Sequence, residues 1–310
     1  MKLTVVTATF NCIRSGNREK LVRCIESVAK LKTPHEHLIY DGASSDGTVD
    51  LIREVGARLE NSSICRFVDS SNANPQTFQT TQTLKLLSEP DTGIYNALNK
   101  GVRDAQGEWF YVLGADDYIC NPEVLDRLIA DGDKYEMLVA PIVRDKPSGL
   151  YQGVEDLWKI LWRNVYSHQS VIMRTPLVRR FDGFDESYKI CADWHLLMKC
   201  HAAAVPINYT TTPIAFYTCG GASEQGPIGH LDHERLHREF LEMTEEEWEA
   251  FCELKCWALM KGFKFAFHRD LALRMSGRRT LWIFAKNILR ILLWPAVIFR
   301  RRFILKRVDA

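Results

Sequence analysis

Three acidic positions in this sequence have the residue types and spacing that suit chemistry on a charged ligand. Asp116 and Asp117 are adjacent and follow the apolar run WFYVLG, so two mutually repelling carboxylates stand at the end of an expected buried strand. A cation beside them would relieve the repulsion, and hard oxygen ligands suit Mg²⁺ or Mn²⁺ shared with substrate phosphates. The alternative is a solvated turn before a helix start at Asn121 and Pro122. The pair is therefore a candidate divalent-cation site.

The other two acidic positions have both a chemical and a structural interpretation. Asp193 opens an expected helix in ICADWHLLMKC, where it could take a proton from a hydroxyl or favour the helix dipole from the first turn. His195, two positions on, could carry a proton or be a partly buried polar residue. Asp41 in YDGASSDGT is explained equally well as part of a strand–helix turn. The residues alone leave these alternatives open.

The elements that must position these residues follow from hydrophobic periodicity. The first sixty residues predict, in order, a strand over 3–10, a helix around 21–29, a strand over 37–41 and a helix over 49–59 that Asp46 or Thr48 could cap. Two strand–helix units in succession predict a parallel sheet with right-handed crossovers. The fold class is therefore α/β, with a mixed but mostly parallel, Rossmann-like sheet flanked by helices.

The rest of the chain continues this pattern with one interruption. Residues 61–83 contain one expected strand, 64–68, and then a polar stretch that we interpret as a long surface loop or disordered insert. The later expectations are a helix over 93–105, the strand WFYVLG, a helix opened by Asn121, helices near 155–163 and 191–202, and antiparallel or mixed strands from 136 to 218. Asp116 and Asp117 then lie at the carboxyl end of a strand, where open α/β sheets bind ligands.

Composition and charge limit the classes of protein to consider. The chain has 310 residues, of which 46% are apolar and 25% are charged, so it is a globular protein and not a disordered or disulfide-stapled one. Its net charge of +1 conceals a tail, residues 269–310, with 11 basic and 2 acidic residues. We expect one α/β domain over residues 1–219 and a helical region over 220–310.

The basic tail suggests contact with a membrane surface. Residues 281–299 are mostly apolar, but Lys286 and Arg290 interrupt them, and a spanning helix needs about 20 predominantly apolar residues. Trp282 and Trp294 are residue types that prefer the membrane interface. We therefore expect an amphipathic helix lying on an anionic membrane. The alternative is a terminal helix packed on the body. Nucleic acid is not expected as a partner, because long aliphatic residues separate the basic ones.

The cysteines and the N-terminal residues bear on the compartment. Nine cysteines occur without a CxxC or zinc-type spacing, which favours reduced thiols and a cytosolic location. Cys252 and Cys256 could share a metal or react together, or be ordinary buried thiols. The start MKLTVVTATFN lacks the core and cleavage site of a signal peptide, so we expect no secretion through such a signal.

Six segments together resemble the family 2 glycosyltransferases of the GT-A fold. In family order they are VVTATFN (5–11), YDGASSDGT (40–48), SEPDTGIYNALNKG (88–101), GEWFYVLGADD (107–117), SHQSVIMR (167–174) and FDESYKICADWHLLMK (184–199). In detail the chain resembles the branch that builds bacterial exopolysaccharide, colanic acid and O-antigen repeat units. The resemblance covers about 200 residues.

The resemblance implies a role for each matched residue. Asp41 would accept a hydrogen bond from a uracil ring, Asp117 would hold a Mn²⁺ or Mg²⁺ ion that bridges the diphosphate, and Asp193 would be the general base of an inverting transfer. The implied nucleotide-sugar pocket consists of Thr7, Thr9, Asn11, Asp41, Asp91, Asn99 and Asp116. The sequence departs from the family pattern at Gly114, where many relatives carry the first Asp of a DxD motif, and at His195, where an acidic residue is common.

These observations predict an inverting transferase that moves a sugar from a nucleotide-diphosphate donor, UDP being expected, to a lipid-diphosphate-linked saccharide. The expected location is peripheral, at the cytoplasmic face of a bacterial inner membrane. One alternative is a nucleotidyltransferase that makes nucleotide sugars, although the loop ATFNCIRSGNREK only partly fits the Gly-rich, basic loop that such an enzyme needs. Another is an inactive membrane-docked scaffold, which intact Asp117 and Asp193 argue against.

Overall fold

The computed structural model describes residues 1–70, 81–145, 150–151 and 166–220, together with residues 232, 235, 236, 239 and 240. The chain divides into two compact units, residues 1–229 and 230–310. The expected helix at 155–163, Cys252, Cys256 and the basic tail lie outside the described residues. No helix in the described part is both long enough and apolar enough to cross a membrane.

The first unit alternates strands and helices in its first half and is richer in strands afterwards. Its elements are β1 (Leu3–Thr9), α1 (Arg18–Val28), β2 (His35–Asp41), α2 (Thr48–Asn61), β3 (Arg66–Asp69), β4 (Gln82–Ser88), α3 (Ile94–Asp104), β5 (Trp109–Val112), β6 (Tyr118–Ile119), α4 (Pro122–Ala130), β7 (Met137–Val139), β8 (Ile142–Arg144), β9 (Leu150–Tyr151), a 3₁₀ turn (His168–Ser170), β10 (Val171–Arg174), α6 (Thr175–Arg180), α7 (Ala192–Ala202), β11 (Ile207–Tyr209) and β12 (Ala215–Tyr217).

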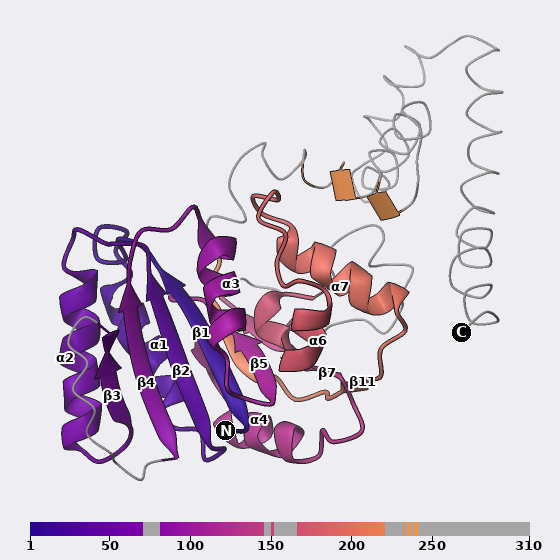
Figure 1. Ribbon diagram of the computed structural model, residues 1–310. Coiled ribbons are helices and arrows are strands. Elements are labelled where there is room, and N and C mark those ends of the chain that lie inside the picture. Colours follow the sequence, from indigo (N-terminus) through magenta and orange to yellow (C-terminus); the bar gives the residue numbers. More distant parts are fainter. Residues whose placement is uncertain are drawn as a thin grey trace, which may run out of the picture. The chain divides into compact units, whose positions relative to one another are not determined.

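The main sheet has eight strands in the order β11-β7-β10-β5-β1-β2-β4-β3. Every neighbouring pair is parallel except the two pairs made by β10. A second sheet has the order β6-β12-β8-β9. The sequence prediction of a mixed but mostly parallel sheet flanked by helices is therefore confirmed. Because β1, β2, β4 and β5 are parallel, their carboxyl ends meet at one edge of the sheet (Figure 1).

Burial explains why these segments form the elements that they do. All seven residues of β2 are buried, as are all but one of β1, so these strands are covered on both faces. β1 consists of β-branched and other apolar residues, whereas β2 also buries polar residues, namely His35, Glu36, His37 and Asp41. α3 lies over β1 and β2 and beside α6 (Figure 1). α4 begins with Asn121 as N-cap and Pro122 in the first turn, as predicted.

The interpretation of residues 61–83 was wrong at its end. Gln82 and Thr83 belong to β4, which lies between β2 and β3 in the sheet. Leu84 and Leu86 point inward and are buried, while Lys85 between them bonds the buried carboxylate of Glu36 at 2.6 Å. The strand is stabilised because it pairs with β2 on one side and with β3 on the other, an arrangement that its polar neighbours in the sequence conceal. Residues 71–80 lie outside the described part.

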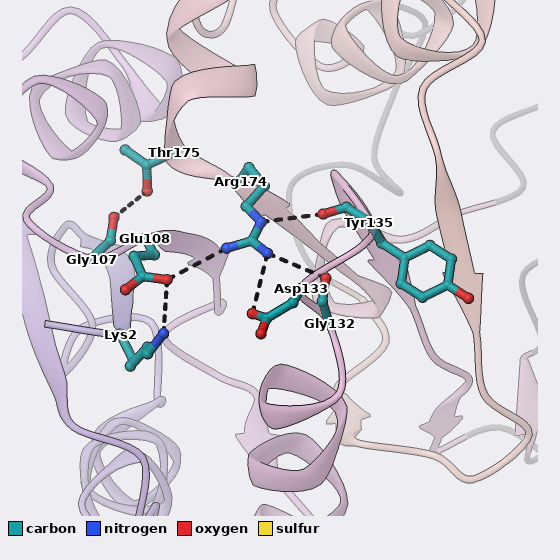
Figure 2. A network of polar contacts seen from close by, with 8 residues as sticks. All are labelled: Lys2, Gly107, Glu108, Gly132, Asp133, Tyr135, Arg174 and Thr175. Carbon is teal, nitrogen blue, oxygen red and sulfur yellow. Dashed lines mark hydrogen bonds and ion pairs between the residues drawn. The ribbon is translucent and has the colours of Figure 1, made fainter.

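A polar cluster around Arg174 joins β10 to the amino end of β5 (Figure 2). The guanidinium lies over the Trp109 ring, 3.9 Å from its centroid, and donates to the carbonyl oxygens of Gly132 and Tyr135 at 3.2 Å each. A further nitrogen lies 3.5 Å from a carboxylate oxygen of Glu108. Arginine suits this position because a planar cation can stack on a ring and donate in several directions at once. The cluster fixes the one antiparallel strand, β10, against the parallel ones.

Candidate active site

The carboxyl edge of the sheet is organised around the buried carboxylate of Asp41, the last residue of β2. Its Oδ1 accepts hydrogen bonds from the hydroxyls of Thr9, at 3.0 Å, and Ser44, at 2.5 Å. Its Oδ2 accepts from the Ser44 N–H at 2.8 Å and the Ser88 hydroxyl at 2.9 Å. A carboxylate offers about four acceptor sites, so all are taken. A nucleobase N–H could bond Asp41 only by replacing one of these hydroxyls.

Asn11 ties the end of β1 to the loop after β2. Its N–H donates to the Ser44 hydroxyl at 2.8 Å and its side-chain oxygen accepts from the Ser45 N–H at 3.1 Å. Asn11 has a φ of 47°, a left-handed conformation that asparagine adopts more readily than most residues. Thr9, Asn11 and Asp41 therefore belong to one hydrogen-bonded network at the sheet edge.

Asp91 approaches the same loop from the segment before α3. A Cβ on Gly42 would lie 2.8 Å from Oδ2 of Asp91, so the carboxylate rests against the backbone just after Asp41. Its Oδ1 accepts from the N–H of Gly93 at 3.0 Å, which precedes α3. The structure thus brings Asp91 to the Asp41 network.

Asp116 and Asp117 stand in the turn between β5 and β6, as predicted. Asp117 is 1% exposed, and its Oδ1 accepts from the N–H of Thr218 at 2.8 Å, while Oδ2 accepts from the side-chain amide of Gln169. Burial, and then repulsion from Asp116, raise the pKa of Asp117 to about 6. Asp116 is partly exposed. The Asp117 carboxylate is therefore held in place in surroundings that disfavour its charged form.

Gly114 leaves the space that the Asp117 carboxylate needs. A Cβ at this position would lie 2.4 Å from Oδ2 of Asp117 and 3.2 Å from Oδ1 of Asp116. The departure from the DxD pattern at Gly114 thus has a steric reason. A side chain here would displace the carboxylate that is expected to hold the metal.

The two carboxylates fit a hard divalent cation, because both offer oxygen and a cation would offset the cost of charging the buried one. Among the described residues, no three His, Cys, Asp or Glu side chains gather closely enough to hold a metal by themselves. A cation at Asp117 would therefore take its other ligands from phosphate oxygens and water, as Mg²⁺ commonly does.

Asp193 lies in the first turn of α7, and a histidine connects it to Asp117. Its Oδ2 is 3.7 Å from Nδ1 of His168, and its Oδ1 accepts from the Trp194 N–H at 2.7 Å. His168 also acts electrostatically on Asp117, lowering its pKa against the larger effect of burial. The next residue, Gln169, is the one that bonds Asp117. One short turn therefore reaches both acidic sites.

The charges of Asp41 and Asp116 both act on Cys12, in the loop after β1. Burial raises the pKa of the Cys12 thiol to about 11, and the charges of Asp41 and Asp116 add to that rise. Cys12 directly follows Asn11, so both acidic sites act on the same loop. One region at the ends of β1 and β2 thus contains Thr9, Asn11, Asp41 and Asp91, and the charge of Asp116 acts on the same loop.

Three residues singled out from the sequence lie away from this region or are otherwise engaged. Thr7 is fully buried, and its hydroxyl lies 2.9 Å from Nε2 of His37. His195 is 3% exposed and packs against the Tyr188 ring at 4.9 Å, about 200° around the helix from Asp193. The environment of His195 favours the interpretation of a buried polar residue.

Asn99 is also engaged elsewhere. Its side chain bonds the segment before α7 through Phe184 and Glu186.

Sequence reasoning assigned no role to His168, Gln169 or Thr218. The first two lie in SHQSVIMR, which contributed to the resemblance, and that match was the available signal. Gln169 is 1% exposed, its side-chain oxygen accepts from the Ser167 hydroxyl, and this orients its amide toward Asp117. Thr218 follows β12 and gave no signal, because the strand pairing of the second sheet brings it to Asp117.

The chain is similar to known glycosyltransferases. The model of glycosyl transferase family 2 matches residues 4–186. A PGL/p-HBAD biosynthesis glycosyltransferase of Mycobacterium bovis is 24% identical over 226 residues, which is 71% of this chain and 77% of that protein. An uncharacterized glycosyltransferase of Mycobacterium tuberculosis is 25% identical over 253 residues, 77% of this chain and 85% of that protein.

Solved structures of similar fold include two with nucleotide sugars bound. S. aureus TarS 1–349 in complex with UDP-GlcNAc has a TM-score of 0.58 at 19% identity and covers 93% of this chain and 79% of that one. The mannosyltransferase PcManGT from Pyrobaculum calidifontis, in complex with GDP-Man and Mn²⁺, has a TM-score of 0.53 at 14% identity, with 94% and 85% covered. Together with the family match over more than half of its length, the fold and the acidic edge show that this chain is a glycosyltransferase and belongs to glycosyl transferase family 2.

Proposed function

We propose that this enzyme transfers a sugar, with inversion, from a nucleotide-diphosphate donor to a saccharide hydroxyl. The observation that carries the proposal is the turn containing His168 and Gln169, which contacts Asp193 on one side and Asp117 on the other. Two carboxylates with different surroundings are thereby held at one site. Different surroundings allow one carboxylate to hold a cation while the other accepts a proton.

The donor is a nucleotide sugar bound at the carboxyl edge, where Thr9, Asn11 and Asp41 form one network. UDP is the preferred nucleotide, since TarS was solved with UDP-GlcNAc, although PcManGT was solved with GDP-Man. In this proposal the uracil N–H takes the place of the Ser44 or Ser88 hydroxyl on Asp41. Asp91 and Asp116 line the ribose and sugar side.

Asp193 accepts the proton of the acceptor hydroxyl as that oxygen attacks the anomeric carbon from the face opposite the leaving group. An uncharged hydroxyl is a weak nucleophile, and a positioned base contributes about 10²–10⁴-fold. Asp117, with Asp116 beside it, would hold Mn²⁺ or Mg²⁺, whose positive charge supports the negative charge of the leaving diphosphate. Gln169 and Thr218 keep the Asp117 carboxylate in place for this task.

The acceptor in this proposal is a lipid-diphosphate-linked saccharide, and the pathway is bacterial surface-polysaccharide synthesis of the exopolysaccharide, colanic acid or O-antigen type. The support is the sequence of residues 269–310, whose basic and apolar composition suits the surface of an anionic membrane. The enzyme then works as a peripheral protein at the cytoplasmic face of the inner membrane. The named relatives belong to mycobacterial PGL/p-HBAD biosynthesis, so the branch of the family is part of the proposal.

A screen of nucleotide sugars by thermal shift, with and without Mn²⁺, tests the donor. A ligand at 100 times its dissociation constant adds about 2.7 kcal/mol to the free energy of unfolding. We expect a Mn²⁺-dependent rise in melting temperature with UDP and with a UDP-sugar. A response to nucleoside triphosphates and sugar phosphates, but not to UDP-sugars, would favour a nucleotidyltransferase. No response to any nucleotide would favour a scaffold.

A further inference from the structure

Asn99, in the second turn of α3, is bonded to the segment that leads into α7. Its side-chain amide donates to the carbonyl oxygen of Phe184 at 2.8 Å and to Oε1 of Glu186 at 2.9 Å, and its side-chain oxygen accepts from the Phe184 N–H at 2.9 Å. Both amide hydrogens are therefore used. Gly183 brings the segment close, since a Cβ there would lie 2.5 Å from the Asn99 oxygen. The Asn99 side chain therefore holds the backbone of Phe184 and has no N–H left to donate to a ligand.

Glu186 strengthens the same contact from the other side. Besides Asn99, its carboxylate accepts from the side-chain amide of Asn96 at 3.0 Å and from the Thr92 hydroxyl at 3.5 Å. These hydrogen bonds, with that from Asn99 first, lower the pKa of Glu186. The residue is exposed, so burial does not explain its position. The Glu186 carboxylate thus accepts hydrogen bonds from Asn96 and Asn99 of α3 and from Thr92 just before this helix.

Tyr95 completes the contact close to α7. Its hydroxyl donates to the carbonyl oxygen of Ile190, and its ring stacks on Phe184 with 5.9 Å between centroids. Asp193 lies three residues beyond Ile190, and its charge contributes to the raised pKa of Tyr95. The segment 184–190 is therefore fixed to α3 near both of its ends.

The segment that leads into the beginning of α3 meets the donor side of the site. Asp91 bonds the N–H of Gly93 and rests against Gly42, next to Asp41. A single helix thus contacts the loop after β2 at its beginning and the segment before Asp193 along its side. A displacement of about 1 Å can cost about 100-fold in rate, so such a link matters for catalysis.

We propose that Asn99 and Glu186 are positioning residues that fix Asp193 relative to the donor site by joining the segment 184–190 to α3. This inference rests on the proposed role of Asp193 as the base. It gives Asn99 a task in holding the acceptor side of the site in place of a contact with the nucleotide sugar. Neither residue needs to touch substrate for this role.

Hydrogen exchange tests the link without knowledge of the substrate. In Asn99→Ala and Glu186→Ala we expect amides in peptides covering 183–191 to exchange at least about tenfold faster, while peptides of β1 and β2 are unchanged. Glu186→Gln keeps one acceptor oxygen and should be intermediate. Glu26→Gln, which removes an exposed ion pair with Arg58, is the matched control and should match the wild type. Unchanged exchange over 183–191 in both alanine variants would overturn the inference.

Turnover and donor binding supply the second readout. With the sugar nucleotide most active in a panel of UDP-glucose, UDP-GlcNAc and GDP-mannose, we expect kcat to fall about 10–100-fold in Glu186→Ala. The dissociation constant of UDP with Mn²⁺ should stay within about twofold of the wild-type value. Unchanged kcat, or an equal loss of UDP binding, would overturn the positioning role. Asp193→Asn separates the two proposals, because near-normal turnover in that variant refutes the base and leaves the exchange result to decide on the link.

Discussion

Nδ1 of His168 lies 3.7 Å from Oδ2 of Asp193, and the same histidine lowers the pKa of Asp117. Its turn is held by the bond from the Ser170 N–H to the Ser167 carbonyl oxygen at 2.8 Å. The proposed base and the proposed cation ligand are thereby positioned by one short segment. Because the two carboxylates have different proposed roles, a change at Asp117 should affect mainly donor binding, and a change at Asp193 should affect mainly transfer.

Asp117→Asn should weaken Mn²⁺-dependent UDP binding by at least about 100-fold, because it removes the buried charged oxygen of the site. Asp116→Asn should do less, since Asp116 is more exposed than Asp117. Calorimetric titration of UDP in the presence of Mn²⁺ measures both. Asp131→Asn, an exposed change at the end of α4, is the control. Equal affinities in wild type and Asp117→Asn would contradict the cation site.

Removing the support of Asp117 should have a smaller effect of the same kind. Gln169→Ala leaves the Asp117 carboxylate in place but deprives it of one donor, so Mn²⁺-dependent UDP affinity should fall about 10–100-fold. The same titration applies. An affinity equal to that of the wild type would mean that Gln169 has only a packing role.

The stability of the fold should fall in mild acid because of His37. Burial lowers its pKa to about 3, while in the unfolded chain it titrates near 6.5. The unfolded state therefore binds more protons, and the free energy of unfolding should drop by about 1.4 kcal/mol per pH unit below about 6.5 on account of this residue. Urea unfolding between pH 7 and 5 measures the slope. His37→Gln should reduce it, and an unaltered slope would assign the effect to other groups.

Arg174→Lys should lower the free energy of unfolding by about 1–3 kcal/mol although it keeps the charge. Arg174 bonds the Gly132 and Tyr135 carbonyl oxygens (Figure 2) and also stacks on Trp109. Lysine cannot do both at once. Arg58→Lys, at an exposed ion pair with Glu26, is the control and should change little. Denaturant unfolding measures the free energy of unfolding of both variants. Equal values would contradict the claim that position 174 requires the geometry of arginine.

The tail should direct binding to anionic vesicles. Changing Arg300, Arg301 and Arg302 to glutamine in the full chain removes about 1 kcal/mol of attraction per residue, so binding should weaken about 100-fold. Flotation with vesicles containing phosphatidylglycerol measures it, and high salt should partly reproduce the change. The control replaces Lys30, Lys32 and Lys134 of the body with glutamine. Equal flotation of tail variant and wild type would reject membrane docking.

Part of this fold could be predicted because local pattern and burial agree. β1 and residues 38–40 of β2 are short, mainly apolar or β-branched runs that end at turn residues, and both strands are buried in the sheet. β4 was missed because Lys85 and the polar residues before it look like surface, although Glu36 compensates the lysine from the neighbouring strand. That pairing is non-local and leaves no trace in a short window of sequence.

The candidate site likewise contains residues that could be predicted from the sequence and residues that could not. Asp41, Asp117 and Asp193 could be found because strand ends and a helix start place acidic residues at predictable positions. The partners of these residues could not. Gln169 and Thr218 reach Asp117 through strand pairings in two sheets, and Asn99 of α3 meets Phe184 in the segment between α6 and α7. Such contacts depend on tertiary structure that periodicity does not encode.

The most direct test of the mechanism is turnover and UDP affinity in Asp193→Asn. This change keeps the size of the side chain and much of its hydrogen bonding but removes the proton acceptor. We predict that UDP binding with Mn²⁺ persists while sugar transfer falls about 10²–10⁴-fold. His195→Ala, at a buried position on the far side of α7, should retain turnover far better. Near-normal transfer in Asp193→Asn, or a larger loss in His195→Ala, would contradict the assignment of Asp193 as the base.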